Sequence, residues 1–181
     1  MKRIVPIVLG VLVVSTGAFA QTPSEIDTAL LAAPANLREG ATVVKWKADY
    51  TYETLRKGTN RLVCMDRSGQ PAQQPFAIEC TSIGNLERLA QNMKFEAEPD
   101  RAKRQAALDA AEANGTRVKP EYGSVWYHVS GPDREHTRNH MTIAVPGATT
   151  QSTGLADNNK MGGVWIMNAG TTTAHLMTPG E

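Results

Sequence analysis

The chain has 181 residues, of which 41% are hydrophobic and 20% are charged. Its 19 lysine and arginine residues are balanced by 18 acidic residues, which gives a formal net charge of +1 at pH 7. A near-neutral chain with no block of Lys or Arg lacks the charge pattern of proteins that bind nucleic acid or anionic membranes, so we expect neither kind of partner.

The first 20 residues contain the three parts of a secretory signal peptide in the expected order. Lys2 and Arg3 make a positive start, residues 4–14 are apolar, and Ala18-Phe19-Ala20 is the small-x-small pattern that signal peptidase reads. The apolar stretch has 11 residues, which is fewer than the about 20 that a membrane-spanning helix needs. A buried N-terminal helix is the alternative interpretation of this stretch.

Cleavage after Ala20 would make Gln21 the first residue of the mature protein. Because this position is not a cysteine, we expect no lipoprotein anchor, and no later segment is apolar enough to cross a bilayer. We therefore predict a signal peptide over residues 1–20 and a single domain over residues 21–181 that is periplasmic or secreted.

Residues 42–56 give the clearest periodic signal, after a short predicted helix over residues 25–33. Apolar side chains alternate there with polar ones, as in a half-buried antiparallel strand or a hairpin of two strands. The apolar set is Val44, Trp46, Ala48, Tyr50 and Tyr52. The alternation places Trp46 in the core, and a returning strand is expected over residues 61–65 after a turn.

The two cysteines, Cys64 and Cys80, enclose 15 residues that look like a loop. An isolated even pair in an exported chain predicts a disulfide. A metal-binding or redox-active pair is the alternative, although the spacing is not CxxC.

Two helices are predicted after the second cysteine. The first runs from Thr81 or Ser82 to about Ala97 and has apolar residues at helical spacing. The second, over residues 101–113, combines alanine with charged residues and should lie on the surface.

Strand patterns dominate the C-terminal third of the chain. Alternation predicts strands over residues 123–129 and 140–145, and a hairpin of residues 164–168 and 172–177. Residues 146–163 look like a loop. Strands at both ends with helices between them predict an α+β domain with a mostly antiparallel sheet, two or three helices and one disulfide.

The histidines offer two candidate metal sites. His136 and His140 have the HxxxH spacing of a helical metal site, but the surrounding residues do not predict a helix. The second candidate combines His140 and Met141 with Met167, His175 and Met177.

Thioether and imidazole groups outside the cytoplasm suit copper. The alternative is structural: methionines on strands are more often core residues, and a histidine opposite Trp165 is more often a packed, hydrogen-bonded side chain. We expect no cofactor, with copper or zinc bound by His140 and His175 as the alternative. His140, His175, Trp165 and Met177 are the candidate ligand-binding residues.

Both histidines can share one cleft if residues 140–145 and 172–177 are neighbouring strands. His140 alternates away from Met141 and Ile143, and His175 shares its side with Met177. One assignment of the faces therefore places both imidazoles opposite the apolar row.

The sequence contains no GxSxG, SxxK, GxGxxG or P-loop motif. The favoured function is consequently a non-enzymatic protein that binds a small molecule or another protein. A copper-type metal-handling protein is the first alternative, and a hydrolase of unknown substrate is the second.

Three blocks of sequence carry a resemblance to a known group of proteins. The blocks are Leu55–Cys64 (LRKGTNRLVC), His140–Pro146 (HMTIAVP), and residues 162–177 with GGVWIM and AHLM. Together they resemble a family of uncharacterised exported bacterial proteins of similar size with a comparable cysteine pair. The resemblance covers about half of the mature chain, implies no activity, and includes His140 and His175.

Overall fold

A computed structural model describes residues 23–179, so the predicted signal peptide and the predicted start at Gln21 lie outside the described residues. These residues form one mixed sheet in the order β2-β1-β3-β4-β5-β6-β8-β7. The strands are β1 (Thr42–Trp46), β2 (Tyr52–Arg56), β3 (Leu62–Asp66), β4 (Phe76–Ser82), β5 (Val125–Gly131), β6 (Arg138–Ala144), β7 (Trp165–Met167) and β8 (His175–Met177). β1 and β3 are parallel, and the other neighbours are antiparallel. The predicted α+β class with a mostly antiparallel sheet is confirmed.

The helices of the described residues fall into two groups. The α-helices are α1 (Pro23–Ala29), α2 (Ala35–Arg38), α3 (Leu86–Glu96), α4 (Arg101–Ala113) and α5 (Thr150–Thr153), and the 3-10 helices are η1 (Ile83–Asn85) and η2 (Asn159–Met161). Two or three helices were expected, and the additional ones are single turns such as α2 and α5. α4 begins at the Asp100 cap and buries only Ala111, which fits the predicted surface helix.

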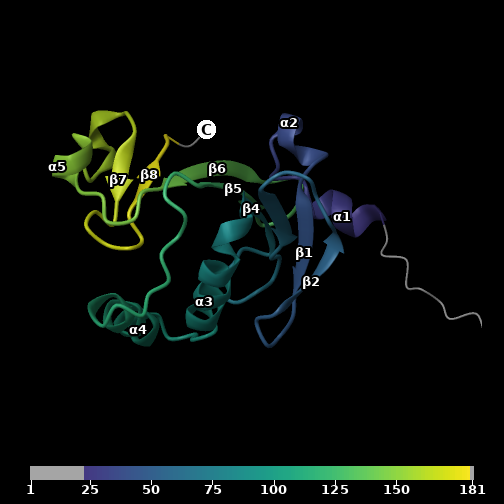
Figure 1. Ribbon diagram of the computed structural model, residues 1–181, viewed down its shortest axis with the longest axis horizontal. Helices are drawn as coiled ribbons and strands as arrows, with labels where there is room; N and C mark the ends of the chain where they lie inside the picture. The colour runs from purple at the N-terminus through teal and green to yellow at the C-terminus, as the bar shows by residue number, and fades with distance from the viewer. Residues whose placement is uncertain (1–22, 180–181) are drawn as a thin grey trace, which may run out of the picture.

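A hydrophobic core covers each face of the first half of the sheet. On one face, the α1 region and the following turn pack against Val43, Cys64, Ile78 and Cys80. On the other face, α3 packs its Leu89 and other apolar residues against β1 and β3. Figure 1 shows β1 and β2 at one end of the sheet and β7 and β8 at the other, with α3 beneath the middle.

The alternation over residues 42–56 resolves into a hairpin rather than one long strand. Trp46 is buried at 9% exposure, as expected, whereas Tyr52 is 43% exposed. Residues 47–51 form the turn, in which Tyr50 has a φ of 65°. Tyr52 is the register partner of Trp46 and its ring packs edge-on against the indole, with centroids 5.4 Å apart, but β2 is an edge strand and leaves this ring partly open to solvent.

The predicted disulfide is present between β3 and β4. Cys64 and Cys80 are direct partners in the antiparallel register, their Cα atoms are 4.1 Å apart, and both side chains are fully buried. β4 itself was not expected, because its residues were assigned partly to a loop and partly to a helix. The disulfide therefore joins two central strands of the sheet.

Replacing both cysteines with alanine should lower the free energy of unfolding by about 2–4 kcal/mol, because the unfolded chain would no longer be cross-linked. Urea denaturation of the Cys64→Ala/Cys80→Ala variant measures this change. A midpoint equal to that of the wild type would show that the bridge does not stabilise the fold.

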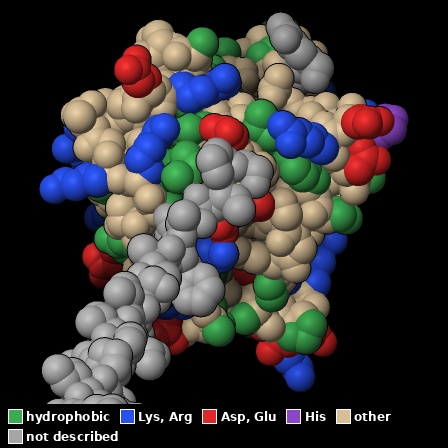
Figure 2. All heavy atoms as spheres, turned by 90° about the vertical axis from the view of Figure 1, so that its right-hand side faces the viewer, with side chains coloured by type: hydrophobic (Ala, Val, Ile, Leu, Met, Phe, Trp, Pro, Cys, Tyr) green, Lys and Arg blue, Asp and Glu red, His purple; other side chains and the backbone are tan. Residues whose placement is uncertain are grey.

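None of the helices within residues 23–179 combines the length and apolar character needed to cross a bilayer. Basic and acidic side chains both occur across the face shown in Figure 2. The sheet face over β5, β6, β8 and β7, which meets the α3 core at Trp126, carries the candidate site.

Candidate functional site

Ionisable side chains form a row across the middle of the sheet. Glu79 on β4 is the register partner of His128 on β5, and His128 is the partner of His140 on β6. The two imidazole rings are stacked, with centroids 6.2 Å apart and planes 28° apart. This row marks the sheet face that α3 does not cover completely.

A cavity of about 340 Å³ lies on this face, and we call it the sheet groove. Strands β5 to β8 form its floor, and Arg88 and Asn92 of α3 form one wall. The floor contributes Trp126, His128, His140, Thr142, Ala144, Met167, His175 and Met177. A second hollow of about 250 Å³, lined by Arg67 and Glu79, adjoins it through His128 and His140.

His140 and His175 line the same cavity, as the sequence suggested. The pairing of β6 with β8 places them on one face but not side by side, since the partner of His175 is Ala144, four residues along β6 from His140. Two other candidates are not in the groove lining. Trp165 pairs with Met177 across β7 and β8 but does not line the cavity, and Met141 lines a hollow near α2 instead.

The HxxxH spacing does not produce a shared site. Residues 132–137 form the loop between β5 and β6 rather than a helix. His136 is exposed and contacts Asp133, with its Nδ1 atom 2.8 Å from one carboxylate oxygen. That contact lowers the pKa of Asp133.

His175 is held in one tautomer. Its Nδ1 atom is 2.7 Å from the carbonyl oxygen of Thr173. Because a carbonyl oxygen only accepts hydrogen bonds, Nδ1 carries the proton and donates it. The Nε2 atom of the neutral ring is therefore left with a lone pair available to a ligand.

The outer wall of the groove is fixed by one buried cation and one carboxylate. Arg88, which is 4% exposed, donates hydrogen bonds to the hydroxyl of Thr173 at 2.8 Å and to the carbonyl of Val118. Burial lowers the pKa of Arg88 to about 10, and repulsion from Arg117 adds to this shift. Glu112 of α4 accepts hydrogen bonds from Thr172 and Thr173. These contacts join α3 and α4 to the segment that precedes His175.

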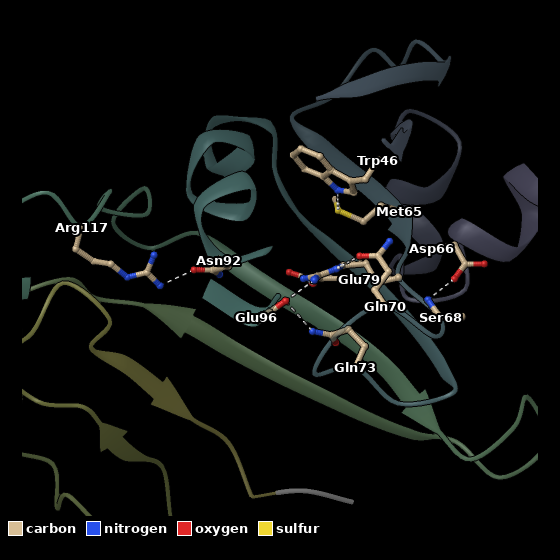
Figure 3. Close-up of polar contacts among 11 residues, drawn as sticks. Trp46, Met65, Asp66, Ser68, Gln70, Gln73, Glu79, Asn92, Glu96 and Arg117 are labelled. Atoms are coloured by element: carbon tan, nitrogen blue, oxygen red, sulfur yellow. Dashed lines mark hydrogen bonds and ion pairs between the residues drawn. The ribbon is translucent and has the colours of Figure 1, made fainter. Parts of the chain in front are cut away.

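The adjoining hollow contains a buried ion-pair network. Arg67 donates to Glu79 at 3.3 Å and to Glu96 at 2.5 Å, and its Nε atom donates to Gln70 at 3.0 Å. Figure 3 shows Glu96 also next to Gln73, so that the carboxylate joins α3 to the loop between β3 and β4. Arg67 and Glu79 are almost fully buried, which makes this network a structural support for the groove.

Burial lowers the pKa of His140, and the nearby imidazoles of His128 and His175 lower it further. The folded state therefore favours the neutral ring, whereas a histidine in the unfolded chain titrates near 6.5. Below that pH the unfolded chain binds more protons than the folded one, so stability falls as the pH drops. The charged groups in the adjoining hollow are Arg67 and Glu79.

We expect the free energy of unfolding to decrease as the pH is lowered through about 6.5. The His140→Gln variant should show a smaller decrease, because it lacks the group that resists protonation. Urea denaturation at several pH values measures both, and His136→Gln, at the exposed loop histidine, is the control. An unchanged decrease in His140→Gln would assign the effect to other groups.

Sequence reasoning missed three of the groove residues that matter most. Trp126, His128 and Arg88 line the cavity, yet none was selected. One signal was available for two of them, because Trp126 and His128 alternate together away from Val125 and Tyr127. A hairpin turn centred on Arg134 would have paired His128 with His140.

The lining residues define what the groove can bind. Three histidines, two methionines and one tryptophan line the cavity, together with Arg88 of α3. Within residues 23–179, no group of three or more His, Cys, Asp or Glu side chains is arranged to hold a metal ion. Soft or aromatic ligands fit this lining chemically.

Searches of protein-family models, curated proteins and solved structures found no match to this chain. The resemblance to an exported bacterial family therefore stays a prediction that rests on the three sequence blocks.

Proposed function

We propose that this protein is a non-enzymatic binding protein that works in the periplasm or after secretion and holds a small ligand in the sheet groove. The observation that carries the proposal is the convergence of His140 and His175 on one cavity together with Trp126 and two methionines. Ligand pockets commonly combine apolar and aromatic walls with a few polar groups in this way.

The extracytoplasmic location is supported by two independent features. The chain begins with the signal-peptide pattern of residues 1–20, and its buried Cys64–Cys80 bridge is typical of oxidising compartments. Intact-mass analysis of protein recovered from the periplasm or medium should give a chain that starts at Gln21. Recovery of a chain that retains Met1 would contradict export.

Thermal-shift screening of the mature protein tests the binding proposal. The panel should contain small aromatic compounds, short peptides, organic anions and metal ions. A ligand present at 100 times its dissociation constant should stabilise the fold by about 2.7 kcal/mol.

Two variants distinguish groove binding from binding elsewhere. Thr142→Phe fills the floor of the groove and should abolish the shift, whereas Thr54→Phe, at an exposed position on β2, should retain it. Equal shifts in both variants would contradict the proposed site, and conversion of the ligand to product would contradict a non-enzymatic role.

A further inference from the structure

The methionines at the β7–β8 end of the groove do not belong to the hydrophobic core. Their sequence neighbours Ile166 and Leu176 pack into the C-terminal core cluster, and Ile166 is fully buried. Because side chains alternate along a strand, Met167 and Met177 point to the opposite face. Both are partly exposed and line the groove, unlike the fully buried Met65. Their sulfur atoms are therefore presented to the cavity rather than used as core filler.

The strand register places these sulfurs beside one imidazole. Met167 is the direct partner of His175 across β7 and β8, and Met177 lies two residues further along β8 on the same face. Directly paired residues have their Cβ atoms about 4.5–5.5 Å apart, which is within the reach of long, flexible methionine side chains. His140 lies on the floor of the same cavity.

The imidazole of His175 is already oriented as a metal ligand. Its Nδ1–H donates to the Thr173 carbonyl, so Nε2 is the free donor atom. A hydrogen bond from the second ring nitrogen to a carbonyl is the usual outer-shell arrangement of metal-binding histidines. Arg88 and Glu112 hold the Thr172–Thr173 segment in place and so fix this geometry.

We propose that this end of the groove binds copper(I), with Nε2 of His175 and the sulfurs of Met167 and Met177 as ligands. Thioether and imidazole groups together select a soft cation. Zinc sites draw instead on cysteine, histidine and carboxylate ligands, and no cluster of three such side chains able to hold a metal is present in residues 23–179. The inference rests on the proposed function, because it names the ligand of the same groove.

Anaerobic competition against a chromophoric copper(I) chelator, with ascorbate as reductant, tests the inference on the mature, disulfide-bonded protein. We expect one copper(I) per chain and much weaker binding of zinc(II). X-ray absorption should detect sulfur in the copper coordination shell. More than one copper(I) bound per chain, with no sulfur detected in the copper coordination shell, would overturn the proposed site.

Near-isosteric variants identify the ligands without emptying a core position. Met167→Leu and Met177→Leu should each weaken copper(I) binding at least about tenfold, and the double variant should abolish it. His175→Gln should also weaken copper(I) binding at least about tenfold. Met161→Leu is the matched control, since Met161 is 82% exposed and lies outside the groove. Unfolding temperatures close to that of the wild type verify that the variants fold.

The outcomes separate the two proposals. Copper(I) binding that persists in the Met167→Leu/Met177→Leu variant overturns the thioether site. Absence of copper(I) binding overturns the inference but leaves the proposed function standing if another compound in the panel binds in a Thr142→Phe-sensitive manner. If no compound binds in that manner and copper(I) also fails, both proposals fall.

Discussion

Replacing Arg67 with methionine should lower the free energy of unfolding by about 3–5 kcal/mol, because the change leaves a buried carboxylate without its counter-charge. The side chains of Arg67 and Glu79 are only 3% and 7% exposed. Glu79 lies on the central strand β4, and with so little of its side chain exposed its carboxylate is largely desolvated. Urea denaturation of the single variant measures the loss.

Two further variants separate the buried charge from the loss of side-chain volume. Arg67→Met/Glu79→Gln removes both charges of the more deeply buried pair and should recover part of the stability, since the carboxylate that still lacks its counter-charge, Glu96, is 23% exposed. Arg61→Met breaks an ion pair with Glu121 in which the arginine side chain is 72% exposed, and it should cost less than about 1 kcal/mol. Equal losses in Arg67→Met and Arg61→Met would contradict a special role for the buried pair.

Trp46→Ala should destabilise the protein by about 3–5 kcal/mol, because it removes the largest side chain of the α3-facing core and leaves a cavity. The indole packs among Val44, Met65 and Leu89, and its N–H donates to the sulfur of Met65 at 3.1 Å. Figure 3 shows the indole directed at that sulfur. Chemical denaturation followed by circular dichroism measures the change without relying on tryptophan fluorescence.

The control for Trp46 is an aromatic residue outside the core. Tyr122 is 73% exposed, so Tyr122→Ala should change stability by no more than about 0.5 kcal/mol. Trp46→Phe keeps most of the apolar volume and removes the N–H donor, so it should lie between the wild type and Trp46→Ala. A loss below about 1 kcal/mol for Trp46→Ala would mean that the core relaxes to fill the space.

The strands with one open face were predictable because alternation reports half-burial. Residues 140–145 alternate cleanly and overlap β6, and residues 172–177 include β8. The assignment of side chains to the two faces of these strands led to the expectation that His140 and His175 share a cavity. The disulfide was predictable from the pairing of two cysteines in a chain with an export signal.

β4 could not be found in the same way, because it is buried on both faces. Five of its seven residues are buried, including Glu79 and Thr81, and the sequence FAIECTS has no alternation of apolar and polar side chains. The charge of Glu79 is tolerated only because Arg67 lies beside it, a long-range contact that local patterns do not contain. A central strand with buried polar residues therefore resembled a loop and the start of a helix.

Predicting the groove would have required knowing how segments that are distant in the sequence meet in the fold. His128 and His140 become partners only through the register of the β5–β6 hairpin, and Arg88 reaches the cavity from a helix that precedes both strands. Spacing within one segment detects none of these contacts. Strand faces were thus accessible from the sequence, whereas the walls of the site were not.

The short length of β7 and β8 has a consequence for how a ligand enters and leaves. Each strand has three residues, and β7 is one of the two edge strands of the described sheet, at the end far from the cross-linked pair β3–β4. Such segments open locally at a lower free energy than the whole domain. Amide hydrogen exchange should then be fastest over residues 165–177 and slowest in β3 and β4. A ligand bound against Met167 and His175 would slow exchange in that segment first, so its residence time would follow the opening rate of this edge rather than the rate of global unfolding.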